Sequence, residues 1–265
     1  MGMWLGRGRK ARRCYGFDEI ALVPGSVTIN PNEVDTSWQM GNKKYRIPII
    51  ASAMDGVVDV NFAVLMSKFG GLAALNLEGV QTRYDNPHDV LTKIANASIE
   101  EATQLLQTVY KQPIKEKLVS KRVKEIKKKG GVACVSSIPQ RAESFGKIAQ
   151  DAGADIFIVQ STVTTVRHIS TEYKTLDFYK FCKTMKIPVI IGNCVTYQTT
   201  LELMETGVKA LLIGIGPGAA CTTRGVLGLG VPQVTAICDA AAARDFYYKK
   251  NALYVPIIAD GGMTT

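Results

Sequence analysis

A cysteine in a glycine-rich loop is the residue best suited to nucleophilic chemistry. Cys221 lies within GIGPGAACTTRGVLGLGVPQ, residues 214–233, directly before two threonines and an arginine. Glycines that follow a strand let the backbone adopt positive φ angles and bring its amides and carbonyls close to a ligand. Neighbouring hydroxyls and a cation favour the thiolate form. We therefore favour a nucleophilic role for Cys221 over burial as a small apolar side chain.

Polar residues also follow several apolar runs elsewhere in the chain. Asp260 ends the run before Gly261 and Gly262, Asn193 ends another, and SAMD (52–55) with Ser52 and Met54 ends a third. A carboxylate accepts hydrogen bonds from vicinal hydroxyls, and glycine amides are open to a phosphate. A strand-end aspartate that caps its own turn is an equally good interpretation of Asp260 alone. The convergence of these residues on one rim would make a binding site.

The remaining cysteines and the histidines point to no metal or disulfide framework. There is no CxxC pair among the six cysteines, and His88 and His168 are distant in sequence. Such usage fits a reducing compartment. No apolar run has the roughly 18 residues that span a bilayer, and the N-terminus lacks the apolar stretch of a secretory signal. We expect a cytoplasmic protein without a membrane partner.

Seven short apolar, β-rich runs alternate with amphipathic segments and must position these residues. Near-continuous hydrophobicity is typical of parallel strands covered by helices. The pattern predicts an α/β fold, a (β/α)8 TIM barrel, with a doubly wound sheet as the alternative. Polar or glycine-rich residues after nearly every strand favour the barrel, whose sites lie at one mouth. The strands are predicted at 47–52, 71–76, 131–137, 155–162, 187–193, 210–216 and 255–261.

The strand count indicates an incomplete barrel. A TIM barrel needs eight strands, and seven are found within 265 residues. We expect an N-terminal arm over 1–46, barrel strands one to seven over 47–265, one catalytic domain, and a missing C-terminal part. Two or three surface helices are expected between strands two and three.

Most of the net charge of +9 comes from two segments. Residues 7–13 carry +5 and residues 111–129 carry +7, which leaves −3 for the rest. The second segment places apolar residues at helical spacing, so its lysines are expected to form a solvated face. Because no aromatic residues are interleaved with the basic ones, nucleic-acid binding is unlikely as a function.

The motifs resemble the IMP dehydrogenase/GMP reductase family over nearly the whole chain. They are FDEIALVPG (17–25), PIIASAMDGVVD (48–59), GGLAALN (70–76), IIGNCVT (190–196), the Cys221 loop and IIADGG (257–262). The sequence looks most like the branch without regulatory CBS domains, since family members that have them insert them between strands two and three, where this chain has only a helical stretch. The resemblance implies NAD-dependent oxidation of IMP to XMP in guanine nucleotide biosynthesis, K⁺ as a monovalent cation, and a homotetramer.

The resemblance also implies roles for individual residues. Cys221 would attack C2 of the purine, and Thr223 would lie beside the hydrolytic water. The other implied sites are substrate binding by Ser52, Met54, Asn193, Asp260 and Gly262, cofactor binding by Gln160, Ser161, Thr162 and Gly214, and K⁺ binding by the carbonyls of Gly216, Gly218 and Cys221.

Three positions depart from the family pattern. Gln160 stands where the family usually has the aspartate that holds the nicotinamide ribose. Ala219 stands in place of a phosphate-binding serine, and Leu212 stands in place of a basic residue. The residues that separate the two reactions in the family lie beyond strand eight. Two alternatives therefore stay open, namely an NADPH-dependent GMP reductase and a silent paralogue that binds purine nucleotide. We expect the isolated 265-residue chain to be inactive.

Overall fold

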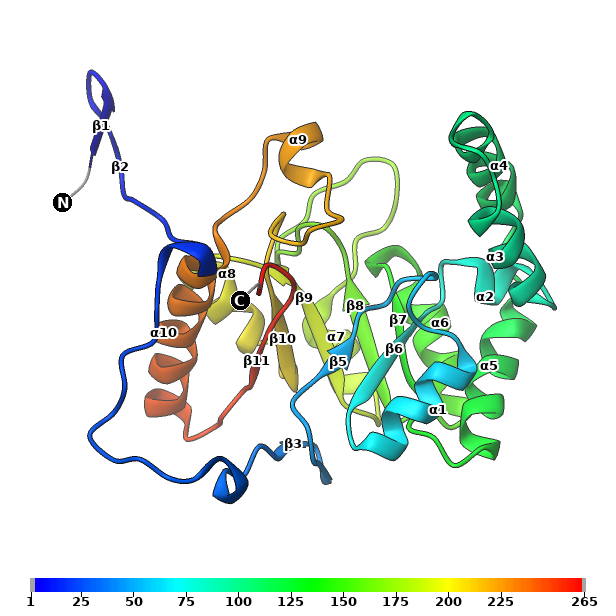
Figure 1. Ribbon diagram of the computed structural model, residues 1–265, viewed down its shortest axis with the longest axis horizontal. Coiled ribbons are helices and arrows are strands. Elements are labelled where there is room, and N and C mark those ends of the chain that lie inside the picture. The colour runs from blue at the N-terminus through cyan, green and yellow to red at the C-terminus, as the bar shows by residue number, and fades with distance from the viewer. Residues whose placement is uncertain (1–2, 264–265) are drawn as a thin grey trace.

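Seven parallel strands form one curled sheet in which neighbours in sequence are neighbours in space (Figure 1). In the computed structural model residues 3–263 are described; residues 1, 2, 264 and 265, the ends of the predicted arm and barrel segments, lie outside them. The sequential order excludes the doubly wound alternative, which requires a reversal of strand order. An incomplete (β/α)8 barrel is thereby confirmed. Its strands are β5 (Ile50–Ala51), β6 (Leu72–Asn76), β7 (Cys134–Ser137), β8 (Ile156–Gln160), β9 (Val189–Cys194), β10 (Ala210–Ile213) and β11 (Ile257–Ala259).

Helices connect the strands and cover the outer face of the sheet. Those that follow the predicted pattern are α1 (Val60–Phe69), α6 (Pro139–Asp151), α7 (Phe178–Thr184), α8 (Tyr197–Met204) and α10 (Gln233–Asn251). A short α9 (Thr223–Leu227) lies in the Cys221 loop. The crossover between β6 and β7 holds four helices, and the expectation of two or three was wrong because a single-turn helix comes first. They are α2 (Val80–Arg83), α3 (Pro87–Ala95), α4 (Ile99–Lys111) and α5 (Glu116–Lys128).

The strands are buried on both faces. Phe157 and Val159 of β8 pack into the core between sheet and helices, whereas Ile156 and Ile158 pack into the barrel interior. Because successive side chains of a strand point to opposite faces, a strand covered on both sides must be apolar at every position. This explains the uninterrupted apolar runs of the sequence.

A β-hairpin closes the amino end of the barrel. It consists of β3 (Trp38–Met40) and β4 (Lys43–Tyr45), which pair antiparallel. Met40 and Tyr45 are buried in the inner core, and the ammonium group of Lys43 forms an ion pair with Asp155 at the start of the β8 unit. The sequence reasoning placed this hairpin in an undivided arm.

The N-terminal arm begins with a second hairpin, β1 (Met3–Gly6) and β2 (Arg9–Ala11), and runs along α10 (Figure 1). It also contains two 3-10 turns, Phe17–Glu19 and Pro31–Glu33. The arm is anchored where the Tyr15 amide donates to Oγ1 of Thr235 at 2.8 Å and where Arg12 pairs with Asp239. Within residues 3–263, none of the helices has the length and apolarity required to span a bilayer.

The basic helix α5 has the expected apolar face, and one of its charged residues also lies on that buried face. Leu118, Val119, Val123 and Ile126 are buried. Arg122, however, is also buried at 4% exposure. Its guanidinium donates to the carbonyls of Gln81, Tyr84 and Asp85 and to the carboxylate of Glu125. One of the charges of this segment therefore holds the crossover together.

Candidate functional site

Three polar side chains from three strands meet at the carboxyl end of the sheet. Nε2 of Gln160 donates to Oδ1 of Asn193 and to Oδ2 of Asp260, both at 3.1 Å. Nδ2 of Asn193 donates to the same Oδ2 at 2.7 Å and to the Gly214 carbonyl at 2.8 Å. These contacts join residues up to 100 positions apart in the sequence. We call Gln160, Asn193 and Asp260 the amide–carboxylate cluster.

The strands bring the cluster together through their register and one close approach. Gln160 ends β8 opposite Gly192 of β9, so the Asn193 side chain begins directly beside it. A Cβ at Gly192 would lie 2.5 Å from Cβ and 2.7 Å from the carbonyl oxygen of Leu212. Only glycine fits there, and the β9–β10 register shifts at the following residue pair. Asn193 is thereby placed at the mouth while remaining 7% exposed.

Cys221 lies exposed in the loop that follows β10. Its Sγ is 3.2 Å from Oγ1 of Thr223. Hydrogen bonding by the side chain and backbone of Thr223, with smaller contributions from the Gly216 amide and the Arg224 charge, lowers the pKa of the Cys221 thiol below its ordinary value. Gly216 has φ +78°, and a Cβ there would lie 2.7 Å from Cγ of Arg224. The loop therefore presents an accessible thiol whose pKa lies below its ordinary value.

The Cys221 loop packs directly on the loop that contains Asp260. A Cβ at Gly261 would lie 3.0 Å from Cα of Gly218, and one at Gly262 would lie 2.6 Å from Cβ of Pro217. Such contact between two backbones requires residues without side chains. The exposed thiol and the amide–carboxylate cluster thus belong to one rim.

Gln233 supports this rim from below and was missed by sequence reasoning. It is 1% exposed, and its Nε2 donates to the Ile213 carbonyl at 2.7 Å and to the Asp260 carbonyl at 3.4 Å. Its Oε1 is buried without a hydrogen-bond partner among the described residues. The position at the start of a helix, just after Pro232, is the only sequence signal, and it does not distinguish Gln233 from an ordinary first-turn residue.

Of the other predicted site residues, Gly214 and Ser161 contact the cluster through their carbonyls, which accept the side-chain and backbone amides of Asn193 at 2.8 Å and 3.0 Å. No hydrogen bond among residues 3–263 links Ser52, Met54 or Thr162 to the cluster. Ser52 and Met54 follow the edge strand β5 and are exposed. The Ser161 hydroxyl lies 2.9 Å from that of Thr164, and Thr162 is exposed. Gly214 is buried with φ +143°.

Two residues at the ends of these strands, Asp55 and Cys194, have side chains that point away from the rim. Oδ2 of Asp55 accepts hydrogen bonds from the Val80 amide at 2.8 Å and from the Tyr110 hydroxyl at 2.7 Å. Asp55 therefore holds helices of the crossover. Cys194 is 1% exposed in the outer core, with Sγ 3.5 Å from Oγ1 of Thr200, and burial raises its pKa to about 11. β9 therefore turns this side chain outward, away from the mouth.

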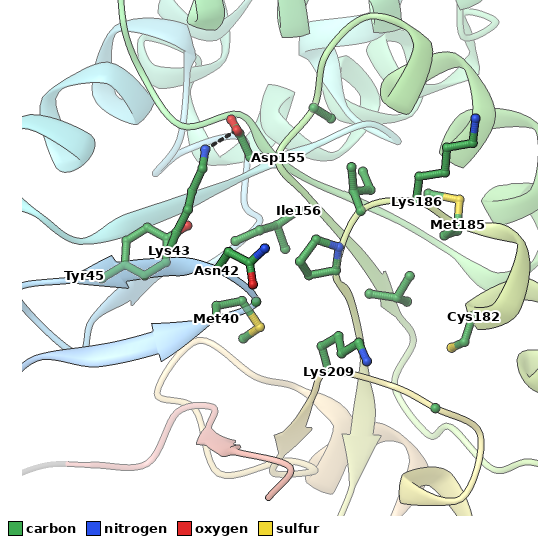
Figure 2. A pocket seen from close by; sticks show the side chains of 16 residues that line it. Met40, Asn42, Lys43, Tyr45, Asp155, Ile156, Cys182, Met185, Lys186 and Lys209 are labelled. Atoms are coloured by element: carbon green, nitrogen blue, oxygen red, sulfur yellow. Dashed lines mark hydrogen bonds and ion pairs between the residues drawn. The ribbon is translucent and has the colours of Figure 1, made fainter. Parts of the chain in front are cut away.

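A cavity of about 430 Å³ lies at the opposite, amino end of the strands (Figure 2). It is bordered by the β3–β4 hairpin and by residues near the starts of β8 and β9, among them Asp155, Ile156 and Met185. Asp155 is occupied by its ion pair with Lys43. None of the predicted site residues lines this cavity. The chemistry-bearing groups and this hollow are thus at different ends of the sheet.

Comparison with known proteins gives a consistent picture. The model of the IMP dehydrogenase / GMP reductase domain matches residues 14–265. An uncharacterized oxidoreductase of Mycolicibacterium smegmatis is 32% identical over 264 residues, which cover 97% of this chain and 70% of the relative. The inosine-5'-monophosphate dehydrogenase of Cryptosporidium parvum is also 32% identical, with 93% of this chain and 61% of the relative covered.

A solved structure agrees with the same assignment. The crystal structure of an IMP dehydrogenase/GMP reductase-like protein from Corynebacterium glutamicum superposes with a TM-score of 0.92 at 32% identity. The match covers 99% of this chain and 70% of that chain. Together with the rim that carries Cys221 and Asp260, these matches show that the chain belongs to the IMP dehydrogenase/GMP reductase family of oxidoreductases.

Proposed function

We propose that this protein is an NAD-dependent IMP dehydrogenase that forms XMP through a covalent intermediate on Cys221. The observation that carries the proposal is the exposed Cys221 thiol, whose pKa is lowered, in a loop packed against the loop of Asp260. An accessible thiol with a lowered pKa, beside a carboxylate and glycine amides suited to hydroxyls and phosphate, is the arrangement that covalent chemistry on a nucleotide needs.

The residues of the rim divide the reaction between them. The thiolate of Cys221 adds to C2 of the hypoxanthine ring, and a bound nicotinamide cofactor would supply the acceptor for the hydride that leaves C2. Water then attacks C2 of the resulting thioimidate, the C–S bond breaks, and XMP and the Cys221 thiol are released. Asp260 accepts hydrogen bonds from the ribose hydroxyls, and the Gly262 amide is offered to the phosphate. The hydroxyl of Thr223 steadies the thiolate and lies beside the attacking water.

The cofactor would bind at the mouth beside Gln160, Ser161, Thr162 and Gly214. Both amide hydrogens of Gln160 are used within the cluster, so Oε1 is its group available to a ribose hydroxyl. Ser161 and Thr162 add hydroxyl groups that donate or accept. The chain therefore supplies neutral partners for a dinucleotide.

The proposed K⁺ would be held by the carbonyls of Gly216, Gly218 and Cys221. The Gly218 carbonyl accepts the Cys221 amide at 3.0 Å, which leaves one lone pair of that oxygen for a cation. The buried, unpartnered Oε1 of Gln233 lies beneath the same loop. Oxygen donors of this kind suit a hard monovalent ion. Its role would be to fix the loop that carries the thiol.

A homo-oligomer, a tetramer by family resemblance, is the proposed assembly. Three apolar side chains of the arm are almost fully exposed: the exposed fractions of Leu22, Val23 and Val27 are 89%, 90% and 81%. Contiguous exposed apolar side chains favour coverage by another subunit. Light scattering of the full-length gene product tests this proposal, because a monomer at micromolar concentration would contradict it.

The silent paralogue is retained as a second candidate because of one observation. The two donors of Gln160 are engaged in the substrate-side cluster, so this residue offers a cofactor less than a free carboxylate would. Such a protein would bind purine nucleotide without turnover.

Alkylation protection tests the proposed covalent function. Cys221 should be modified by iodoacetamide more slowly in the presence of IMP and NAD⁺ than with NAD⁺ alone, as measured by peptide mass spectrometry. Exposed Cys238 on α10 is the internal control and should react equally in both samples. Unchanged labelling of Cys221 would remove the covalent mechanism.

Activity assays on the full-length gene product separate the two reactions of the family. NADH formation from IMP indicates the dehydrogenase, and NADPH consumption with GMP indicates the reductase. Nucleotide binding without either activity indicates the silent paralogue.

A further inference from the structure

The amide–carboxylate cluster has a hydrogen-bond pattern that fixes the orientation of every member. Asn193 must point Nδ2 toward the Gly214 carbonyl, since that oxygen can only accept. Its Oδ1 therefore faces Gln160, which must donate a hydrogen bond to it from Nε2. The second hydrogen of this Nε2 and the second hydrogen of Asn193 Nδ2 both go to Oδ2 of Asp260. The cluster has a single arrangement in which all four contacts are satisfied.

The two oxygens of Asp260 are thereby made unequal. Oδ2 accepts two hydrogen bonds from amides, whereas Oδ1 accepts none from the described residues. Among residues 3–263, the ionisable side chain to which Gln160 donates a hydrogen bond is that of Asp260. The next carboxylate along the mouth, Glu78, is bound to the Ser137 hydroxyl and paired with Arg141. The two hydrogen bonds to Oδ2 thus hold the carboxylate group in one orientation.

We propose that Gln160 is a positioning residue for substrate, which locks Asp260 through Oδ2 so that Oδ1 is presented to the ribose hydroxyls of a purine ribonucleoside monophosphate. The inference rests on the proposed function for the identity of the ligand. It assigns to Gln160 an action on the substrate-binding carboxylate, in addition to any contact with a cofactor through Oε1. Gln160 supplies one of the two donors that fix Oδ2, and Asn193 supplies the other.

The test replaces the donating amide by an isosteric carboxyl group. In Gln160→Glu, a second carboxylate faces Oδ2 of Asp260 at a distance near the present 3.1 Å. Two carboxylates this close repel each other when both are ionised, whereas one shared proton at lower pH restores a hydrogen bond between them. The dissociation constant for IMP, measured by titration calorimetry on the full-length gene product, should rise by about tenfold or more at pH 8. It should return to within about threefold of the parent at pH 5.5.

A matched control makes the same chemical change outside the site. Gln198 on α8 donates to Glu202 at 2.9 Å on an exposed face. Gln198→Glu should bind IMP like the parent at both pH values. Gln160→Met removes the donors without adding a charge, and its loss of IMP affinity should be similar at pH 8 and pH 5.5. This variant keeps the inference testable if Gln160→Glu fails to fold.

Thermal unfolding without nucleotide separates this inference from the proposed function. The drop in Tm of Gln160→Glu relative to the parent should be several degrees larger at pH 8 than at pH 5.5, and Gln198→Glu should show no such difference. If the parent does not bind IMP, the proposed function fails, and the Tm comparison alone decides whether Gln160 holds Asp260. A pH-independent Tm difference overturns the inference, and so does parental IMP affinity in Gln160→Glu at pH 8 or, if that variant does not fold, in Gln160→Met.

Discussion

The hydroxyl of Tyr110, near the end of α4, donates a 2.7 Å hydrogen bond to Oδ2 of Asp55, in the loop after β5. The two residues are 55 positions apart. The same oxygen accepts the Val80 amide at the start of α2, and Oδ1 is buried without a partner among the described residues. Burial and the Asp55 charge raise the pKa of the Tyr110 hydroxyl. This contact ties the projecting helices of the crossover to the loop that contains Ser52 and Met54.

Removing the Tyr110 hydroxyl should loosen that connection. Tyr110→Phe deletes a hydrogen bond to a charged acceptor, so we expect the free energy of unfolding to fall by about 1–2 kcal/mol. Urea denaturation measures the change. Tyr173→Phe removes an exposed hydroxyl that lies 2.9 Å from Nε2 of His168 and should cost under about 0.5 kcal/mol. Equal effects of the two variants would show that the Asp55 contact has no special weight.

Thr223 should control the reactivity of Cys221. Thr223→Val keeps the shape of the side chain and removes the hydroxyl that lowers the pKa of the thiol. The pH–rate profile of iodoacetamide labelling should move to higher pH, and labelling at pH 7 should slow severalfold. Thr222→Val is the matched control, because the Thr222 hydroxyl makes no hydrogen bond among residues 3–263. If Thr222→Val shifted the profile as much, the Thr223 contact would not be the cause.

Asp155 should contribute stability that is lost in acid. Burial raises its pKa, but hydrogen bonds from Lys127, Lys43 and the Ala133 amide outweigh burial and leave the pKa below its ordinary value. A carboxyl group with a depressed folded-state pKa stabilises the fold above its unfolded-state pKa of about 3.9, and this stability disappears as pH falls through the folded-state value. Asp155→Asn should therefore cost about 1–2 kcal/mol at pH 7 and less below about pH 4.

Urea denaturation at several pH values checks the Asp155 prediction. Asp151→Asn provides a control, since Asp151 is exposed at the end of α6 and forms no ion pair among the described residues. The stability difference between this control and the parent should stay small at every pH. A constant penalty for Asp155→Asn from pH 3 to pH 7 would contradict the assigned ion pairs.

Arg122 should be intolerant even of a conservative change. A lysine at this position cannot donate to the carbonyls of Gln81, Tyr84 and Asp85 together, so buried and part-buried acceptors are left unpaired. We expect Arg122→Lys to lower the free energy of unfolding by about 2–4 kcal/mol. Lys124→Ala on the exposed side of α5 should change it by less than about 0.5 kcal/mol. Thermal denaturation measures both variants, and similar Tm values for the two would show that Arg122 does not hold the crossover.

The barrel strands could be predicted because burial on both faces forces an apolar residue at each position. The run around Ile156–Gln160 carries this signal within five residues, and helices start at local caps such as Asp59, which accepts the Phe62 amide at 2.7 Å. The β3–β4 hairpin gives no comparable signal. Its strands have three residues each, and only Met40 and Tyr45 reveal burial, one in each strand.

The rim could be predicted as a place but not as a set of contacts. Strand ends in a parallel barrel meet at one mouth, so Asn193 and Asp260 were expected there. The partners of Gln160, Asp55 and Gln233 depend on how residues 20 to 100 positions apart are aligned by the packed sheet. Local sequence patterns do not encode such alignment, which is why Asp55 was expected at the rim and instead secures the crossover.

The β3–β4 hairpin covers the amino end of the barrel interior. Met40 and Tyr45 pack into the interior at the amino end, and the Lys43–Asp155 ion pair joins the hairpin to the residue before β8. The hairpin contacts thus lie at the amino end of the strands, and the loops at the carboxyl end carry the reactive groups. Exchanging loops at the carboxyl end should therefore change the reactive groups while the packing at the amino end is kept. This makes the framework suitable for grafting new loops.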